Sequence, residues 1–317
     1  MTKKKIFITG MSGYIGTLFV KKLIELDWVE SIYGMDLKPF DFEHEKVHFQ
    51  IMSINSEELS NELVRINPDI VVHLSFIVNP IHDEILSYKV NVEGTENLLH
   101  AVKEANVSQL MVASSGTAYG AFPDNPVPLT EEHPIRKHGS FQYANNKAIV
   151  EKITKQFGDE NKDIILSIIR PTVVYGEKVD NYLSGILEYP IIPRIKGYSP
   201  DLQFVHEDDV VRAMVTIIEK KGRGGYNISP NDHITLSEII KMMEKKSIFI
   251  PYTFAKIAIN TAWKLKLKFQ KYLLGFMDYM MYPWILSSDK LINELDFKYE
   301  YTSKQAISVL IERIKRK

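Results

Sequence analysis

The segment that decides the fold is Thr9-Gly10-Met11-Ser12-Gly13-Tyr14-Ile15-Gly16. It follows a β-branched and aromatic run at residues 4–9 and precedes an apolar-periodic stretch at residues 17–26, which predicts a strand, a tight turn and a helix. Glycines let the backbone of such a turn approach a pyrophosphate, and the helix start offers free amides and a positive dipole end. The segment therefore predicts half of a βαβ unit with a dinucleotide-binding turn.

The turn and the next strand together predict the cofactor. We expect cofactor contacts from the turn residues Gly10, Ser12, Gly13, Tyr14, Ile15 and Gly16. Asp36 ends the second predicted strand, 20 residues after Gly16. Its carboxylate would accept hydrogen bonds from adenosine ribose hydroxyls and repel a 2′-phosphate, which favours NAD over NADP. The alternatives are a turn-forming aspartate before Pro39 and a place for NADP beside the Lys38 cation.

The alternation of strands and helices continues along the chain. Further strands are expected at residues 31–35, 70–74, 109–114 and 164–169, and further helices at 90–105 and 143–158. This pattern predicts an α/β fold, a doubly wound (Rossmann) parallel sheet. The rhythm loosens after Pro171, so we expect an NAD-binding domain at residues 1–170 and a smaller mixed, mostly helical C-terminal substrate lobe at 171–317, with residues 204–228 returning to the core.

Composition narrows the function classes. The chain has 317 residues, 39 basic and 40 acidic, and a net charge of −1, so no bulk field attracts nucleic acid and a small-molecule substrate is expected. It contains no cysteine, which excludes disulfides, thiolate metal ligands and a cysteine nucleophile, and its histidines lack metal-ligand spacing, so no metal is expected. The amino terminus lacks the pattern of a signal peptide, and no transmembrane segment is found; a cytoplasmic location is expected.

Three residues carry the expected chemistry. Tyr143 and Lys147 are four residues apart on a predicted helix and share one face. A phenol has a pKa of about 10, and a nearby cation would move it toward the working range. Ser115 follows a predicted strand at the carboxyl edge of the sheet. We expect Tyr143 to take the alcohol proton, Ser115 to hydrogen-bond the reacting oxygen and Lys147 to hold the nicotinamide ribose as well; the alternative for the tyrosine and lysine pair is an exposed helix face.

The order and spacing of these motifs resemble the extended short-chain dehydrogenase/reductase family, of the NAD-dependent epimerase/dehydratase type. Residues 73–74, 91–99, 170–176 and 204–210 are each similar to a family signature segment. The resemblance implies that Asn91 fixes the geometry of the active site, with a helix cap as the alternative, and that Pro171 and Val173 contact the nicotinamide. It further implies a homodimer through the helix of Tyr143 and its neighbour. It also adds cofactor contacts at Ser53, Ile54, Leu74 and Ser75.

The sequence departs from the family at positions that bear on the reaction. Gly116 and Thr117 stand where sugar dehydratases of the family carry an Asp-Glu pair, so dehydration is disfavoured. Leu202 stands where nucleotide-sugar members carry a diphosphate-clamping arginine. Arg194 and Arg212 are candidate replacements, or simply surface arginines. In addition, Phe76 replaces a commonly small residue, and Ser53 replaces an aspartate often found near the adenine.

Residues 248–286 resemble the family least. Five lysines between Lys256 and Lys271 precede a stretch rich in leucine, methionine and aromatic residues. The segment either packs the substrate lobe or forms a basic amphipathic surface that rests on a membrane or admits an apolar substrate.

Three functions remain open. The first is a nucleotide-sugar 4-epimerase that transfers a hydride to and from NAD. The second is an NAD-dependent dehydrogenase of an apolar, hydroxysteroid-like alcohol. The third is a non-catalytic dinucleotide sensor, because a fold alone does not establish chemistry.

Overall fold

The computed structural model describes residues 2–79, 81–139, 141–177, 179, 185, 187–265 and 277–316. Its main element is a seven-stranded sheet in which every neighbouring pair of strands is parallel. In spatial order the strands are β11 (Gly224–Ile228), β6 (Ile165–Pro171), β5 (Gln109–Ala113), β4 (Ile70–His73), β1 (Lys4–Thr9), β2 (Val29–Asp36) and β3 (Val47–Ile51). The predicted doubly wound parallel sheet is confirmed.

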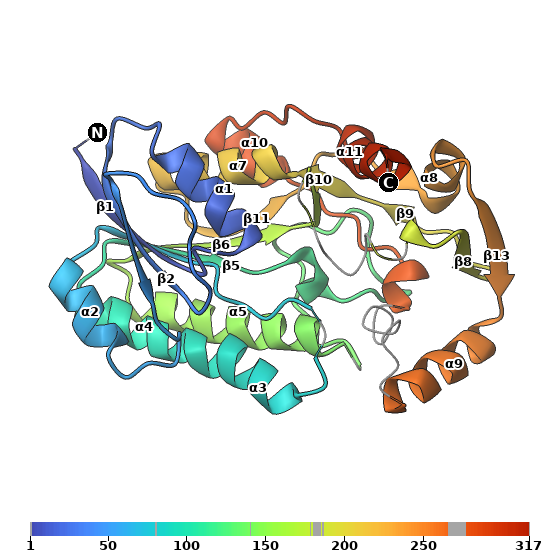
Figure 1. The fold of residues 1–317 in the computed structure, drawn as a ribbon, viewed down its shortest axis with the longest axis horizontal. Coiled ribbons are helices and arrows are strands. Elements are labelled where there is room, and N and C mark those ends of the chain that lie inside the picture. The colour runs from blue at the N-terminus through green and yellow to red at the C-terminus, as the bar shows by residue number, and fades with distance from the viewer. Residues whose placement is uncertain are drawn as a thin grey trace.

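Helices cover both faces of the sheet (Figure 1). One face packs against α1 (Tyr14–Leu23) and α7 (Glu207–Glu219). The other packs against α2 (Leu59–Ile66), α4 (Gly94–Glu104) and α5 (Gln142–Glu160). A short helix α3 (Glu84–Tyr88) continues through a π-helical turn at Lys89–Glu93 into α4. The strand order reverses between β1 and β4, and ligands of such folds bind at this switch point, beyond the carboxyl ends of the strands.

Two details differ from the predicted elements. The first helix begins at Tyr14 rather than at residue 17, because Gly13 has extended backbone and acts as the N-cap directly after the turn. The predicted elements also do not include β3 and α2. β3 has no fully buried residue, so its side chains lack the continuous apolar run of the central strands. α2 buries only Leu59, Leu63 and Ile66.

The remaining elements form the C-terminal lobe, which has its own core. Three two-stranded sheets pair β7 (Val173–Tyr175) with β10 (Phe204–His206), β9 (Asp201–Leu202) with β12 (Ile234–Thr235), and β8 (Ile191–Ile195) with β13 (Lys246–Ile250). The described helices here are α8 (Leu236–Met242), α9 (Tyr252–Lys264) and α11 (Ser303–Arg316), whereas α10 (Asp289–Leu295) places Leu291 and Leu295 in the core of the main sheet. Between these lobe segments, α7 and β11 pack into the main sheet. The expected boundary after residue 170 lies inside β6, so a division there stays a prediction.

The basic and apolar segment at residues 248–286 does not behave as one unit. Its last part packs inside the protein: Tyr279, Trp284 and Leu286 are at most 3% exposed and form a core with Tyr119 and Phe141. Residues 266–276 lie outside the described residues. Within the described parts of the chain, no helix has the length and apolar character required to cross a membrane.

Candidate active site

The glycine turn lies against the end of β4, and two of its glycines have no room for a side chain. A Cβ on Gly10, which has a φ of +74°, would lie 2.7 Å from the backbone nitrogen of Ser75. A Cβ on Gly16 would lie 2.4 Å from the carbonyl oxygen of Gly10. The turn therefore brings its backbone to the end of the sheet with the first turn of α1 packed directly above it.

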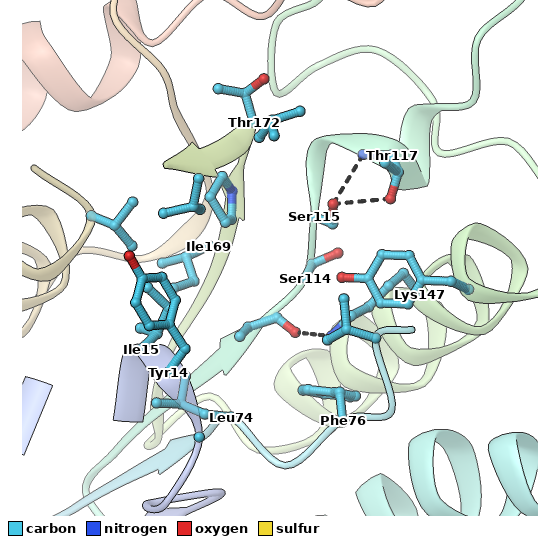
Figure 2. Close-up of a pocket in the computed structure, with 18 of the residues that line it drawn as sticks. Tyr14, Ile15, Leu74, Phe76, Ser114, Ser115, Thr117, Lys147, Ile169 and Thr172 are labelled. Carbon is cyan, nitrogen blue, oxygen red and sulfur yellow. Dashed lines mark hydrogen bonds between the residues drawn. The ribbon is translucent and has the colours of Figure 1, made fainter. Parts of the chain in front are cut away.

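The start of α1 meets the chemical requirements of a dinucleotide pyrophosphate. Gly13 caps the helix without a side-chain hydrogen bond, so the first backbone N–H groups of α1 have no intrahelical acceptor. Tyr14 extends from the same turn along the pocket (Figure 2), and its hydroxyl is buried without a hydrogen-bond partner among the described residues. Unpaired donors at a helix start fit an anionic group. The turn thus fits the cofactor that its sequence predicted.

A pocket of about 320 Å³ runs from this turn to the expected catalytic residues. Its lining includes Ser115, Tyr143 and Lys147, which the sequence singled out, together with Leu74, Pro171 and Val173. Its apolar lining includes Val78 from the segment after β4, and Val179 and Trp284 from the C-terminal lobe. The fold therefore brings together three residues from two distant motifs and the turn that precedes α1.

The Ser115 hydroxyl is oriented by its neighbour Thr117. Ser115 Oγ accepts hydrogen bonds from the Thr117 backbone N–H at 3.2 Å and from the Thr117 hydroxyl at 2.9 Å (Figure 2). A serine hydroxyl has two acceptor sites and one donor. With both acceptor sites used, the remaining function of Ser115 is to donate its own hydrogen to an oxygen in the pocket.

The Tyr143 phenol differs from the prediction in its protonation. Burial raises the pKa of Tyr143 to about 12, and a hydrogen bond with Ser115 acts in the opposite direction. The expected lowering by Lys147 is not found, because the ammonium group is directed elsewhere. Lys147 Nζ donates to the carbonyl oxygen of Ala113 at 2.6 Å and lies 2.9 Å from the centre of the Phe76 ring. Tyr143 is therefore protonated at neutral pH in the protein alone.

Lys147 itself is 1% exposed, and burial holds its pKa well below the usual value. The charge of Glu151, one helical turn further along α5, acts against this effect. Phe76, noted in the sequence as unusually large, contacts the buried His73 with tilted rings and 4.4 Å between ring centres, and the Lys147 ammonium group lies over its ring. The larger residue thus closes the side of the pocket where Lys147 lies.

A buried ion pair links β6 to α5, the helix that carries Tyr143 and Lys147. Glu151 on α5 and Arg170 on β6 are 1% and 2% exposed, with a shortest oxygen–nitrogen distance of 2.6 Å. The Ser114 hydroxyl donates to Glu151 Oε1 at 2.5 Å, and Arg170 donates to the Tyr119 hydroxyl at 2.7 Å. Glu151 therefore connects the residue before Ser115 to the helix of Tyr143 and Lys147.

Sequence reasoning missed two of these groups. Glu151 and Thr117 were not selected as site residues, although Glu151 repeats the four-residue spacing that links Tyr143 to Lys147. In the sequence, Thr117 indicates only that the dehydratase glutamate is absent. No local signal showed that its hydroxyl would bond Ser115.

Ser12 in the turn and Asp36 beside it are outside the described lining of the pocket. The Gly10 N–H donates to the carbonyl of Met35, directly before Asp36. The Ser12 hydroxyl donates to the carbonyl of Lys38 at 2.8 Å. Asp36 Oδ1 also accepts hydrogen bonds from the Leu37 and Lys38 N–H groups. The structure therefore contains the turn-forming aspartate that was the alternative to a ribose contact.

The other predicted cofactor contacts outside the pocket lining have structural partners. Asn91 is fully buried, and its amide accepts from the N–H of Ile77 at 2.7 Å and donates to the same residue's carbonyl at 3.1 Å. It thereby fixes the segment that leads to Val78 at the pocket. Ile54 is 3% exposed and belongs to the core, while Ser53 Oγ accepts from a nearby backbone N–H. Ser75 lies next to Gly10.

The two candidate arginines have other partners. Arg194 donates to the hydroxyls of Ser199 and Ser237 and lies over the Phe249 ring. Arg212 pairs with Asp209 at 2.6 Å. Neither belongs to the described lining of the pocket. Within the described residues, no cluster of histidine and carboxylate side chains has the arrangement of a metal site.

A family model and a curated relative both match most of this chain. The family model described as "NAD dependent epimerase/dehydratase family" matches residues 6–229. The putative UDP-glucose 4-epimerase of Methanocaldococcus jannaschii is 25% identical over 258 residues, which cover 75% of this chain and 81% of that protein.

Solved structures share the fold. The UDP-glucose 4-epimerase of Thermotoga maritima, solved with UDP-glucose, has a TM-score of 0.76 at 20% identity and covers 98% of this chain and 99% of its own. The dTDP-glucose 4,6-dehydratase of Bacillus anthracis, in complex with NAD, has a TM-score of 0.74 at 19% identity and covers 99% and 97%.

Proposed function

Because the chain belongs to the NAD-dependent epimerase/dehydratase family, we propose that it oxidises a secondary alcohol with Tyr143 as the acid–base group. The observation that carries this proposal is the meeting of Ser115, Tyr143 and Lys147 in the pocket that begins at the glycine turn. NAD, the cofactor of the family, supplies the hydride acceptor when bound.

The residues of the chain supply the proton chemistry. The Ser115 hydroxyl, which is hydrogen-bonded to Tyr143 in the protein alone, donates to the reacting oxygen when substrate is bound. Tyr143 accepts the alcohol proton during oxidation and returns it during reduction. With the pKa of Tyr143 at about 12, the phenol is protonated at neutral pH, so it is ready to act as the acid. The rate of oxidation is then expected to rise with pH, because the fraction of phenolate rises.

We assign the cofactor contacts to residues that the sequence predicted for them. The amides that begin α1 hold the pyrophosphate, and the Asp36 carboxylate holds the adenosine ribose. Lys147 holds the nicotinamide ribose, with the backbone of Pro171 and Val173 against the nicotinamide. Both of these residues line the pocket beside Ser115.

The specific form we propose first is epimerisation of a nucleotide sugar at carbon 4. It is supported by relatives that are themselves UDP-glucose 4-epimerases by name. Dehydration is disfavoured, since Gly116 and Thr117 provide no carboxylate and the Thr117 hydroxyl is bonded to Ser115. An epimerase returns its hydride, so no net NADH accumulates.

A second candidate is oxidation of an apolar alcohol. The observation that favours it is the composition of the described lining, in which Val78, Val179 and Trp284 are apolar and Lys147 is the one cation. A neighbouring small apolar pocket includes Leu202 at the position of the expected diphosphate-binding arginine. An apolar alcohol would be oxidised with net formation of NADH.

The two candidates are separated by one set of measurements. Calorimetric titration with NAD and NADP tests the cofactor, and turnover with UDP-glucose or with a hydroxysteroid tests the substrate class. Interconversion of the sugar without NADH supports the epimerase, while NADH from the steroid supports the dehydrogenase. If neither dinucleotide binds, the proposal is wrong; if Tyr143→Phe retains the cellular role and a bulky residue at Gly13 abolishes it, the chain is a sensor.

We also propose a homodimer through α5 and its neighbour α4, which lie side by side on one face of the sheet. Two such pairs would form a four-helix interface. Light scattering of the purified protein tests this, and a mass of 36.5 kDa, that of one chain, would contradict it.

A further inference from the structure

Helix α9 has a second apolar face on its solvent side. The inner face contains the buried Ala255 and Ala262. On the outer side, Phe254 is 69% exposed, and Ile257 and Leu265 are each 64% exposed. Isolated exposed apolar residues are common on soluble proteins, but three large ones along one short helix are not scattered singly.

The outer residues follow helical spacing. Phe254, Ile257, Ala258, Thr261 and Leu265 are separated by three, four, seven and eleven residues from the first, so they form one stripe along the helix and its C-cap. The centre of the stripe lies about a quarter turn around the helix from Ala255 and Ala262, so the two faces adjoin. α9 is therefore apolar on two faces, one toward the protein and one toward solvent.

The strand before α9 continues the exposed apolar surface. Ile248 and Phe249 in β13 are 54% and 55% exposed, and Tyr252 at the start of the helix is 38% exposed. Figure 1 shows α9 below β13 at the edge of the molecule, apart from the helices that cover the main sheet. We call residues 248–265 the α9 surface.

The charge of this region differs from that of the whole chain. Residues 245–265 contain four lysines and no aspartate or glutamate, although the chain has a net charge of −1. Lys246, Lys256 and Lys264 are exposed. Lysines near an anionic bilayer are attracted to its phosphate groups. Within residues 245–265, the combination of an apolar stripe and lysines without carboxylates is typical of a helix that lies in a membrane interface.

The α9 surface also adjoins the pocket. Trp263, near the end of α9, stacks on His82 with 3.9 Å between ring centres. The segment that carries His82 begins with Val78 and Asn79, which line the pocket. A membrane under α9 would therefore lie beside the segment that borders the candidate active site.

We propose that the α9 surface docks on membranes that contain anionic phospholipids. Phe254, Ile257 and Leu265 lie among the upper acyl chains, and the lysines lie at the phosphates. A second copy of this chain is a less suitable occupant, because pairing two α9 surfaces would bring like charges together. This surface is independent of the substrate assigned above.

The test is flotation of the full chain with vesicles of phosphatidylcholine alone or mixed with phosphatidylserine. We expect flotation with the mixed vesicles and little with phosphatidylcholine alone. The double variant Phe254→Gln and Ile257→Gln is expected to reduce flotation more than about tenfold, and Lys256→Gln with Lys264→Gln to reduce the phosphatidylserine dependence. Val64→Gln, which changes a 52% exposed apolar residue on α2, is the matched control and should float as the wild type does.

Calorimetric NAD binding by each variant shows that the sheet and glycine turn remain folded. The proposal is overturned if the wild type does not float, or if the double variant floats equally well. It is also overturned if the wild type does not bind vesicles but self-associates in sedimentation, and the double variant loses this self-association. The occupant of the α9 surface would then be a second copy of the chain. None of these outcomes depends on catalytic turnover.

Discussion

Two helices of this chain carry a tyrosine followed four residues later by a lysine. The pair in α5 is Tyr143 and Lys147, and the pair in α9 is Tyr252 and Lys256. In both pairs the lysine Nζ lies 5.8 Å from the centre of the tyrosine ring. Helix geometry alone therefore gives the two pairs the same separation.

Their surroundings are opposite. Lys147 is 1% exposed and donates to the carbonyl of Ala113, whereas Tyr252 is 38% exposed and Lys256 faces solvent. Only the α5 pair has a serine hydroxyl and the glycine turn in the same pocket. The comparison shows that a tyrosine and a lysine four residues apart do not make a catalytic pair by their spacing alone. The pair in α5 differs because it is buried and because other segments place further groups beside it.

The largest expected difference between the pairs is catalytic. Tyr143→Phe removes the acid–base group and should lower kcat by about 10²–10⁴-fold while NAD binding remains. Tyr252→Phe makes the same change in the exposed pair and should leave kcat unchanged. Steady-state kinetics with the identified substrate measure both variants, and equal effects would remove the distinction between the helices.

The next difference concerns stability. Glu151→Leu leaves Arg170 buried without its carboxylate and should cost about 3–5 kcal/mol of unfolding free energy. Asn260 occupies the equivalent place in α9, eight residues after its tyrosine, and is exposed. Asn260→Leu should change stability by about 0.5 kcal/mol or less. Urea unfolding compares the two, and adding Arg170→Met to Glu151→Leu should recover part of the loss.

A smaller effect is expected on the pH dependence of stability, through the buried His73 and the charge of Lys147. Burial, and then the charge of Lys147, lowers the pKa of His73 to about 3. Its ring is held between the hydroxyls of Thr9 and Thr95. The folded pKa lies below the unfolded value of about 6.5, so the unfolded state binds the proton first and stability is lost as pH falls from about 6.5 toward 3.

Between pH 7 and pH 5 this residue should account for about 2 kcal/mol of lost stability. His73→Gln removes the titrating group, so its unfolding free energy should change less over the same interval. Urea unfolding of both proteins at the two pH values gives the difference. An identical pH dependence would mean that His73 is not held neutral.

The smallest expected effect concerns the orientation of Ser115. Thr117→Val removes one of the two hydrogen bonds that Ser115 accepts and should lower kcat by less than about tenfold, since the backbone N–H bond remains. Ser115→Ala removes the donor to Tyr143, so the pKa of the phenol should rise and the pH profile of oxidation should move upward. Thr253→Val in α9 is the control and should change neither quantity.

Much of the site was predictable because its signals are local. The glycine turn needs small residues within eight positions, and the spacing of Tyr143 and Lys147 follows from one helical turn. The apolar runs that form β1, β4 and β5 require burial on both faces of a sheet, which fixed the fold class. The sequence by itself therefore determined the dinucleotide turn, the parallel sheet and the family.

Only the tertiary structure decided how these groups interact. The direction of the Lys147 ammonium depends on Phe76 and Ala113, and the pairing of Glu151 with Arg170 joins residues on different elements. The contrast between the buried Tyr279, Trp284 and Leu286 and the exposed α9 surface likewise depends on which segments pack against each. Burial sets the pKa of a side chain and the partners it meets, and burial is a property of packed distant segments that local spacing does not encode.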